Sequence, residues 1–365
     1  MIAHVCHITT IHPALDTRIF QKECVTLRKA GYRVTLLVCN QESQELEGVD
    51  IKSLSVEYGN RIDRFRKTAR AALQAAKELN ADIYHFHDPE LIPVGLRLIK
   101  AGKKVIYDAH EDVPLQILSK PWIPKPLRLV IATVFRQYEN RALRKLSAAV
   151  VANPPMVNRF KKHNKHTRLV CNYPDLERAD TQAWSEKQEE VAYVGSLTRV
   201  RGIKEMVQAL EGTPVRLQLG GKWHFEAFKK EVQAEQGWQQ VDEWGFINRA
   251  QINDMLGRAK IGLSVLHPIP NYQQAYSVKV FEYMAAGIPV IISHFPMWKS
   301  IVDQHHCGLA VDPMNVEAVR SAILYLLEHP QEAQAMGKRG QAAAFKFYNW
   351  ESQAKELISL YQEIL

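Results

Sequence analysis

The 365-residue sequence lacks the features that mark membrane-spanning and secreted proteins. No apolar run reaches the roughly 18 residues that a membrane-spanning helix needs. The N-terminal stretch MIAHVCHITT has no basic segment followed by a long apolar run, so no signal peptide is predicted. The five cysteines are odd in number and scattered without metal-ligand spacing, which favours reduced thiols and no zinc motif. We therefore expect a cytoplasmic protein, long enough for two domains.

The net charge of +8 is unevenly distributed along the chain. Residues 119–168 contain twelve Lys or Arg and a single acidic residue, Glu139, so this segment carries +11 by difference and the remainder is slightly acidic. Such a segment suits a phosphate-rich partner, either a nucleic acid or an anionic membrane face. The alternative is a solvated basic surface with no partner.

Apolar runs of strand length alternate with helical patterns, which predicts βαβ units and parallel sheets. Eleven such runs are too many for one open sheet: 2–8, 33–39, 82–87, 104–110, 148–152, 190–196, 215–221, 243–247, 261–267, 289–293 and 308–311. We predict an N-terminal Rossmann-like domain over 1–172, a polar linker over 173–190, and a second Rossmann-like domain over 191–345. A helix over 346–365 completes the chain. Ligands of such sheets bind at the carboxyl ends of the strands, so we expect a cleft there.

The stretch QQAYSVKVFEYMAAGIPVIIS, residues 273–293, predicts a short helix, a turn at Gly287 and a buried strand. Ser277 and Lys279 lie at the helix N-terminus, where free N–H groups and a positive side chain favour phosphate. Glu282, one turn later, can accept two hydrogen bonds from a vicinal diol such as ribose. The alternative is a surface helix that carries an i, i+3 Lys–Glu pair.

A second anion site is predicted after the strand 190–196, where the chain turns at Gly195-Ser196. Arg199 and Arg201 flank this turn before the next helix, and guanidinium groups suit the oxygens of a diphosphate. Gly221, after the following strand, allows a ligand to approach the backbone closely.

The motif SVKVFEYMAAGIPVI resembles the nucleotide-sugar signature of retaining glycosyltransferases of family 4, which adopt the two-domain GT-B fold. That family usually carries two glutamates. Glu282 matches the second, whereas Gln274 stands at the first, and the Ser277-x-Lys279 pattern matches a sub-group of the family. Ser196 likewise stands where relatives usually have Arg.

This resemblance implies a catalytic role for Arg201 and Lys279, which would stabilise the departing diphosphate, and for His87, which would position the sugar. It also implies that the backbone at Phe246 and Ile247, which follow Gly245, contacts the base of the nucleotide. The residues with implied donor-binding roles are Glu282, Ser277, Arg199, Gly221, Phe246, Ile247 and Gln274. In this fold the last helix usually crosses back to the first domain, where we expect Trp350, Leu357, Leu360 and Tyr361 to be buried.

The acceptor side is predicted at strand ends of the first domain. The first strand–helix loop offers Thr10, His12 and Arg18, and lacks the glycines with which many relatives approach the pyrophosphate. His87 resembles the family histidine beside the transferred sugar, and His110 follows the next strand. A metal site among these histidines and carboxylates is conceivable, but the family generally needs no bound metal, and we expect none to be obligatory. Each of these polar residues is also compatible with a purely structural role.

The segment 119–145 interleaves apolar and basic residues. Trp122, Ile123, Leu127, Val130, Ile131 and Phe135 could enter a membrane interface while Lys120, Lys125 and Arg128 meet anionic headgroups. The alternative is that Leu129, Val130 and Val134 are packed core. The family resemblance favours membrane association, since many relatives extend lipid-linked acceptors.

We therefore expect a cytoplasmic enzyme, peripheral at the inner membrane face. It would transfer a sugar from a nucleotide diphosphate donor to a hydroxyl of a saccharide or lipid-linked acceptor in cell-surface polysaccharide or glycolipid synthesis. The alternatives are a GT-B sugar-nucleotide epimerase and a non-catalytic GT-B partner subunit. A nucleic-acid binder would explain the basic segment but not the Lys279–Glu282 pattern, so we expect no nucleic-acid partner.

Overall fold

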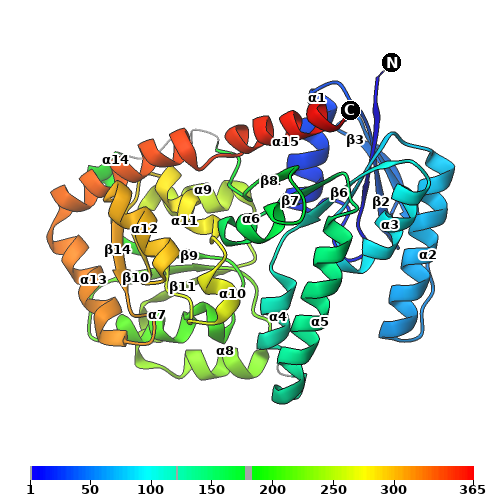
Figure 1. The fold of residues 1–365 in the computed structure, drawn as a ribbon. Coiled ribbons are helices and arrows are strands. Elements are labelled where there is room, and N and C mark those ends of the chain that lie inside the picture. The colour runs from blue at the N-terminus through cyan, green and yellow to red at the C-terminus, as the bar shows by residue number, and fades with distance from the viewer. Residues whose placement is uncertain (1, 121, 177–182) are drawn as a thin grey trace. The chain divides into compact units, whose positions relative to one another are not determined.

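The computed structural model describes all residues except 1, 121 and 177–182, and the chain divides into two compact units (Figure 1). The first unit comprises residues 1–172 and 350–365, and the second comprises residues 173–349. The expected linker over 173–190 lies partly outside the described residues. Its described end contains a 3₁₀ turn, Trp184–Glu186, and runs into β9 at Gln188. The cleft expected between the two domains stays a prediction.

The first unit is built on an eight-stranded sheet in the order β3-β4-β2-β1-β5-β6-β7-β8. Neighbouring strands are parallel except for the hairpin β3–β4. The strands are β1 His4–Ile8, β2 Arg33–Cys39, β3 Gln44–Leu46, β4 Val49–Leu54, β5 Ile83–Phe86, β6 Lys104–Ala109, β7 Ala148–Val151 and β8 Thr167–Leu169. The helices are a π-helical segment Thr17–Cys24, α1 Val25–Lys29, α2 Arg61–Leu79, α3 Ile92–Lys100, α4 Val113–Ser119, α5 Lys125–Leu143, α6 Pro154–Lys161 and α15 Trp350–Ile364, with a 3₁₀ turn at Pro89–Leu91.

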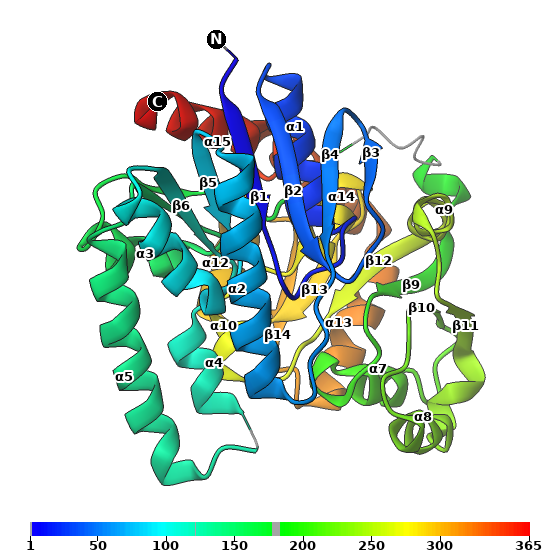
Figure 2. The same ribbon diagram turned by 90° about the vertical axis from the view of Figure 1, so that its right-hand side faces the viewer.

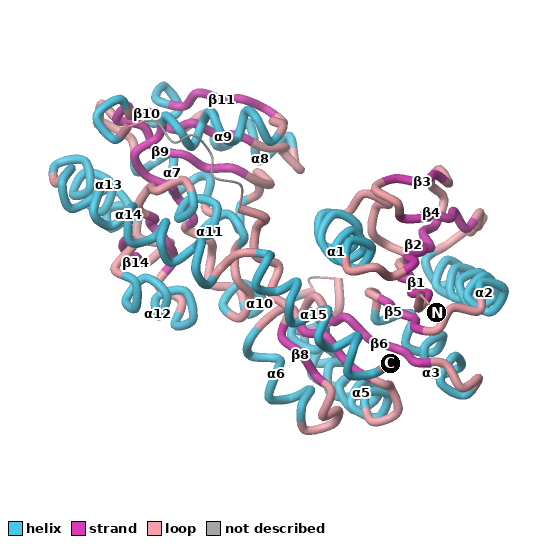
Figure 3. Tube along the Cα trace, turned by 90° about the horizontal axis from the view of Figure 1, so that it is seen from above, coloured by secondary structure: helices cyan, strands magenta, loops and turns pink. Residues whose placement is uncertain are grey.

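Helices cover both faces of this sheet because side chains alternate along each strand. On β1, Cys6 faces the core cluster formed with α2, α3 and α6, whereas Val5 faces the cluster formed with the π-helical segment, α1 and α15. Figure 3 shows α1 and α2 on opposite sides of β1 and β2. In α15 the buried residues are Trp350, Leu357, Leu360 and Tyr361, as the helical spacing predicts. This helix belongs to the first unit, although it begins at Trp350 rather than 346.

The second unit contains a fully parallel six-stranded sheet in the order β11-β10-β9-β12-β13-β14. Its strands are β9 Gln188–Val194, β10 Arg216–Gly220, β11 Val241–Gly245, β12 Ala259–Ser264, β13 Val290–Ser293 and β14 Gly308–Val311. Its helices are α7 Ile203–Ala209, α8 Glu226–Gln233, α9 Arg249–Arg258, α10 Pro270–Gln273, α11 Val278–Ala285, α12 Pro296–His305, α13 Val316–Glu328 and α14 Pro330–Phe347, with 3₁₀ turns at Arg199–Arg201 and Gln236–Gln240.

All eleven predicted strands are present, and the sequence reading missed β3, β4 and β8. Two of these, β3 and β8, are three residues long, which is too short for a periodic pattern, and every residue of β3 is exposed. Asp16 is the predicted N-cap and accepts hydrogen bonds from the N–H groups of Arg18 and Ile19.

Helix α5 runs beside α4 (Figure 2). Part of its surface is apolar and exposed. The alternative prediction, that Leu129, Val130 and Val134 are packed in the core, is wrong because these side chains are 67%, 58% and 63% exposed. Leu127 and Ile131 are exposed as well. Two residues expected in the interface are not available to it: Ile123 is buried, and Phe135 packs against the core. Within the described residues, no helix is long and apolar enough to cross a bilayer.

Candidate functional site

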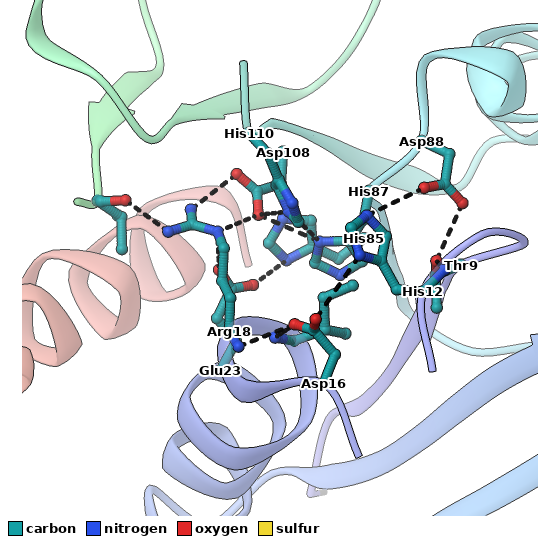
Figure 4. A network of polar contacts seen from close by, with 12 residues as sticks. Thr9, His12, Asp16, Arg18, Glu23, His85, His87, Asp88, Asp108 and His110 are labelled. Atoms are coloured by element: carbon teal, nitrogen blue, oxygen red, sulfur yellow. Dashed lines mark hydrogen bonds and ion pairs between the residues drawn. The ribbon is translucent and has the colours of Figure 1, made fainter. Parts of the chain in front are cut away.

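The carboxyl ends of β1, β5 and β6 bring together a cluster of histidines and carboxylates in the first unit (Figure 4). His7 on β1 is the register partner of His85 on β5, and His87 follows two residues later on the same face. His7 Nδ1 lies 2.9 Å from His87 Nε2. His110, after β6, lies with its Nε2 2.8 Å from Asp108 Oδ2. The predicted acceptor-side residues His87 and His110 therefore meet around one carboxylate.

Arg18 fixes that carboxylate from below. Its Nε and Nη2 donate to the two Asp108 oxygens at 2.9 and 2.8 Å, and its Nη1 donates to the Val170 carbonyl at 2.8 Å. Arg18 is 4% exposed and Asp108 is fully buried, and the Arg18 guanidinium counters the effect of burial and holds the pKa of Asp108 well below its usual value. Arg18 was predicted to face an acceptor. In the structure, the Arg18 N–H groups instead donate to Asp108 and to the Val170 carbonyl inside the core. Arg18 therefore positions Asp108.

Thr10 also serves to hold a carboxylate. Its N–H and hydroxyl donate to Asp88 Oδ2 at 2.5 and 3.1 Å, and Thr9 adds a third donor at 3.0 Å. Asp88 is 1% exposed, and His12 Nε2 lies 3.5 Å from its other oxygen. A hydrogen bond with Asp16 raises the pKa of His12.

These groups surround a pocket of about 340 Å³ in the first unit. Its lining includes His12, His87, Asp88, His110 and Glu111. Burial lowers the pKa of His87 to about 4, so its ring is neutral near pH 7. Imidazoles and carboxylates can together donate to and accept from several hydroxyl groups, which is what a saccharide presents.

In the second unit, the turns after β9, β10 and β11 stack on one another through glycine. Gly195 N–H donates to the Gly220 carbonyl at 2.9 Å, and Gly221 N–H donates to the Gly245 carbonyl at 2.7 Å. Gly221 has φ +151°, and a Cβ there would lie 1.8 Å from the Gly195 oxygen. The predicted close approach at Gly221 is therefore an approach of backbone to backbone, which shapes the turn at Gly195.

Lys279 points at this turn. A Cβ on Gly195 would lie 2.9 Å from Lys279 Nζ, and the ammonium lies 3.9 Å from the centroid of the Tyr193 ring. The residue is 8% exposed, and its ammonium has no ion pair or hydrogen bond with any residue that the structure describes. Burial, and next the charge of Arg201, lower the pKa of Lys279 well below its usual value of 10.5. Arg201 stacks its guanidinium on Tyr272 at 4.7 Å and likewise has no anionic partner in the described chain.

The other predicted donor residues lie in varied surroundings. Glu282 is half-buried and accepts from Arg249 Nη1 at 2.5 Å. Arg199 pairs with Glu231 of α8 and rests on Phe228, so the structure does not bring it together with Arg201 as a second free cation. Ser277 is the N-cap of α11 but its hydroxyl makes no capping bond. Gln274 is exposed, Phe246 is 86% exposed, and Ile247 is buried.

Sequence reasoning missed Glu23, Tyr193 and Arg249. Glu23 had a signal: it follows Ile19 by four residues and so lies on the apolar face of its helical segment. Tyr193 stands just before the Gly195 turn. Arg249 lies far from Glu282 in sequence, and nothing in the local pattern pairs the two.

Two family models match adjacent parts of the chain. "Glycosyltransferase Family 4" matches residues 21–178, and "Glycosyl transferases group 1" matches residues 175–343. The chain belongs to the family 4, group 1 glycosyltransferases.

Curated relatives and solved structures agree with this assignment. The transferase is 24% identical to the D-rhamnosyltransferase WbpZ of Pseudomonas aeruginosa, over 74% of this chain and 70% of that protein. It is 20% identical to the MMP alpha-(1->4)-mannosyltransferase of Mycolicibacterium hassiacum, over 80% and 74%. Its fold is similar to sucrose-phosphate synthase from Thermosynechococcus elongatus, with a TM-score of 0.78, 19% identity and 99% of each chain covered. Anabaena HepE in complex with UDP and glucose has a TM-score of 0.74 at 13% identity, covering 99% and 100%. The predicted GT-B fold and enzyme class are confirmed.

The depressed pKa of Lys279 predicts that anion binding takes up a proton. A bound anion stabilises the charged ammonium, so the pKa rises toward 10.5 or above on binding. At a pH between the pKa of Lys279 in the free enzyme and its pKa in the anion complex, Lys279 is neutral in the free enzyme and protonated in the complex. Affinity for inorganic pyrophosphate should therefore fall as pH rises through this window, with uptake approaching one proton. Calorimetric titration in two buffers of different ionisation enthalpy measures the uptake.

The Lys279→Met variant should abolish this proton uptake, whereas Lys338→Met, at an exposed position in α14, should preserve it. Equal uptake by the wild type and Lys279→Met would show that Lys279 does not face the anion.

Proposed function

We propose that this glycosyltransferase moves a hexose or related sugar from a nucleotide diphosphate sugar to a hydroxyl group, with retention of anomeric configuration. The acceptor would be a saccharide or a lipid-linked saccharide in cell-surface polysaccharide or glycolipid synthesis. The observation that carries the proposal is the buried amine of Lys279, which forms no ion pair or hydrogen bond within the described chain. An unpaired buried charge is costly, and a diphosphate would neutralise it.

The chemistry needs positive charge where the leaving group becomes negative. As the bond from the anomeric carbon to the diphosphate oxygen breaks, charge accumulates on the β-phosphate. Lys279 and Arg201 are the two cations that can stabilise it. The acceptor oxygen attacks from the face that the diphosphate leaves, and its proton passes to a diphosphate oxygen. This step needs no protein base and, with two cations in place, no obligatory metal.

Glu282 would bind the ribose of the donor. Its carboxylate is held by Arg249, which is 51% exposed, so the pair is a weak one that costs about 1 kcal/mol or less to separate. Ribose hydroxyls could share or replace Arg249. Ser277 and the backbone at Phe246 and Ile247 complete the donor contacts that the family resemblance implies.

The pocket of the first unit would hold the acceptor and the transferred sugar. His110, fixed by Asp108, would donate to or accept from hydroxyl groups, with His12 and Asp88 in the same lining. His87 would position the sugar through contact with its ring, because its two nitrogens face Asp108 and His7. The named activities of the relatives, rhamnosyl and mannosyl transfer, support a hexosyl donor.

The surface of α5 supports attachment to an anionic membrane. Leu127, Val130, Ile131 and Val134 recur at helical spacing and are exposed, within the segment that carries a net charge of +11. Apolar insertion combined with basic residues is the usual composition of an interfacial helix. Attachment would bring the enzyme to lipid-linked acceptors at the inner membrane face.

The transfer reaction is tested by incubating the enzyme with a panel of nucleotide sugars and lipid-linked saccharides. Release of nucleoside diphosphate should require the acceptor, and nuclear magnetic resonance of the product should show the anomeric configuration of the donor. Isomerised or hydrolysed sugar that forms equally well without acceptor would favour the epimerase instead.

Lys279→Met and Arg201→Gln should lower kcat more than they raise the KM for the donor. Charge on the β-phosphate is larger in the transition state than in the bound donor, and loss of one such group typically costs about 100-fold or more. The double variant should lose less than the product of the two single effects, because both cations serve one anion. Steady-state kinetics decide this. If a variant changes only KM, the replaced residue binds the donor equally well in the ground state and the transition state, and its catalytic role is wrong.

Glu282→Ala should weaken donor binding by about 1.5–3 kcal/mol, the range for a hydrogen bond to a charged group. The matched control is Arg249→Ala, which breaks the same ion pair but leaves the carboxylate, and should not weaken binding. Calorimetric titration with the donor measures both. If both variants lose affinity equally, the ion pair rather than the ribose contact is responsible.

Cosedimentation with liposomes tests the α5 surface. Binding should increase with the fraction of anionic lipid and fall with salt. Replacing Lys125 and Arg136 with Ser should reduce it by roughly 1 kcal/mol per charge, and Val130→Ser with Val134→Ser should reduce it further. Arg128 is unsuitable because its guanidinium bonds to the carbonyls of Ile123 and Leu118.

The charge control replaces two exposed lysines elsewhere, Lys100 and Lys338, with Ser. An equal loss in this control would attribute binding to net charge alone. Concentration-dependent dimerisation that the valine changes abolish would assign the surface to a second copy of the chain.

A further inference from the structure

The histidine cluster continues from the pocket into a buried group that reaches the pocket lining through His87. His7, His85 and His87 are at most 2% exposed, and Glu23 of the π-helical segment is completely buried beside them. One nitrogen of each histidine and one oxygen of Glu23 all lie within 4.8 Å of one another. The four residues come from β1, from the end of β5 and from a segment that covers the same face of the sheet.

Several polar atoms of this group are unsatisfied. Both carboxylate oxygens of Glu23 and Nε2 of His85 are buried and make no hydrogen bond. Arg18 Nε lies 3.1 Å from Glu23 Oε1, but its single hydrogen is directed to Asp108 Oδ2. Buried polar atoms are nearly always bonded, because each one left without a partner costs about 1–3 kcal/mol. Either a proton shared between Glu23 and Asp108 or a bound cation would satisfy the Glu23 carboxylate.

The surrounding hydrogen bonds resemble those that orient metal-binding histidines. His87 Nδ1 lies 3.1 Å from Asp108 Oδ2, and His85 Nδ1 lies 2.7 Å from the Tyr361 hydroxyl. Histidines that bind metals usually use their second nitrogen in this way, with a carboxylate or another polar group that fixes the ring. Asp108 is itself fixed by Arg18.

We propose that His7, Glu23, His85 and His87 bind a divalent transition-metal ion, with zinc the best match. Three imidazoles and one carboxylate are borderline ligands of the kind that zinc prefers, whereas magnesium and calcium prefer oxygen alone. The ion is structural: it joins β1, β5 and the π-helical segment, and through Tyr361 it supports α15. His87 also lines the pocket, which gives an ion a path of entry.

The competing explanation is a metal-free core in which Glu23 carries a proton. Titration with Co²⁺ distinguishes the metal site from the metal-free core. Co²⁺ can replace Zn²⁺ in protein sites, and it absorbs visible light strongly when it has four ligands. The full-length protein is freed of metal with a chelator, dialysed and titrated with Co²⁺ alone. We expect intense visible d–d bands that saturate at one ion per chain, and displacement of these bands by Zn²⁺. Zn²⁺ should also raise the melting temperature of the metal-free protein.

Absence of these bands in the wild type, with no thermal shift by Zn²⁺, would overturn the proposal without any variant. So would a strong near-ultraviolet thiolate-to-cobalt band, since it would place the ion on a cysteine such as Cys24, next to Glu23 in the chain.

Variants assign the ligands. Glu23→Gln and His85→Gln should each abolish the bands or weaken binding by more than the roughly 10–100-fold expected for Tyr361→Phe, which removes only an orienting group. His224→Gln, at an exposed position in the second unit, should leave binding unchanged. His110→Gln tests the neighbouring group of His87, Asp108 and His110. Loss of the bands in His110→Gln, together with retention in Glu23→Gln, would contradict the assignment.

Discussion

The buried ion pair of Arg18 and Asp108 is the interaction on which the first unit's site depends. Asp108 lies where β6 ends, and three groups converge on it: the Arg18 guanidinium, the His87 ring and the His110 ring. Arg18 also donates to the Val170 carbonyl, so one side chain connects the π-helical segment Thr17–Cys24 to the residue that follows β8. Desolvating both charges is expensive, and removing either partner would leave the other charge unpaired. The pair therefore holds the histidines in one arrangement beneath the pocket.

The two units use buried cations in opposite ways. In the first, Arg18 is satisfied by protein acceptors, and nothing about it calls for a ligand. In the second, Lys279 is nearly as enclosed, but its ammonium lies over the face of the Tyr193 ring without an ion pair in the described chain, while Arg201 rests on Tyr272. A cation–π contact compensates part of the desolvation of an ammonium, but not the whole of it. The second unit thus has positive charge available for an incoming anion.

Patterns along the chain were enough to predict the strands, the two units and the returning helix, because alternation and helical spacing record which faces are buried. They also located Lys279 and Glu282, which lie within one short motif. They failed where a role depends on a partner distant in sequence. Arg18 is 90 residues from Asp108, and Glu282 is 33 residues from Arg249. Arg199 and Arg201 are alike in the local sequence, and only the distant Glu231, which pairs with Arg199, distinguishes them. Val130 and Val134 could be read as core or as surface, and only the packing of α5 decided between them.

In the proposed function, Lys279 and Arg201 face the β-phosphate of a nucleotide sugar. The most direct measurement compares the affinity of the wild-type enzyme for a nucleoside diphosphate and for the corresponding monophosphate, by calorimetric titration at fixed salt and pH. We expect the diphosphate to bind at least about tenfold more tightly, a difference of about 1.4 kcal/mol, and we expect Lys279→Met to remove most of this preference. Equal affinities in the wild type, or an undiminished preference in the variant, would contradict it.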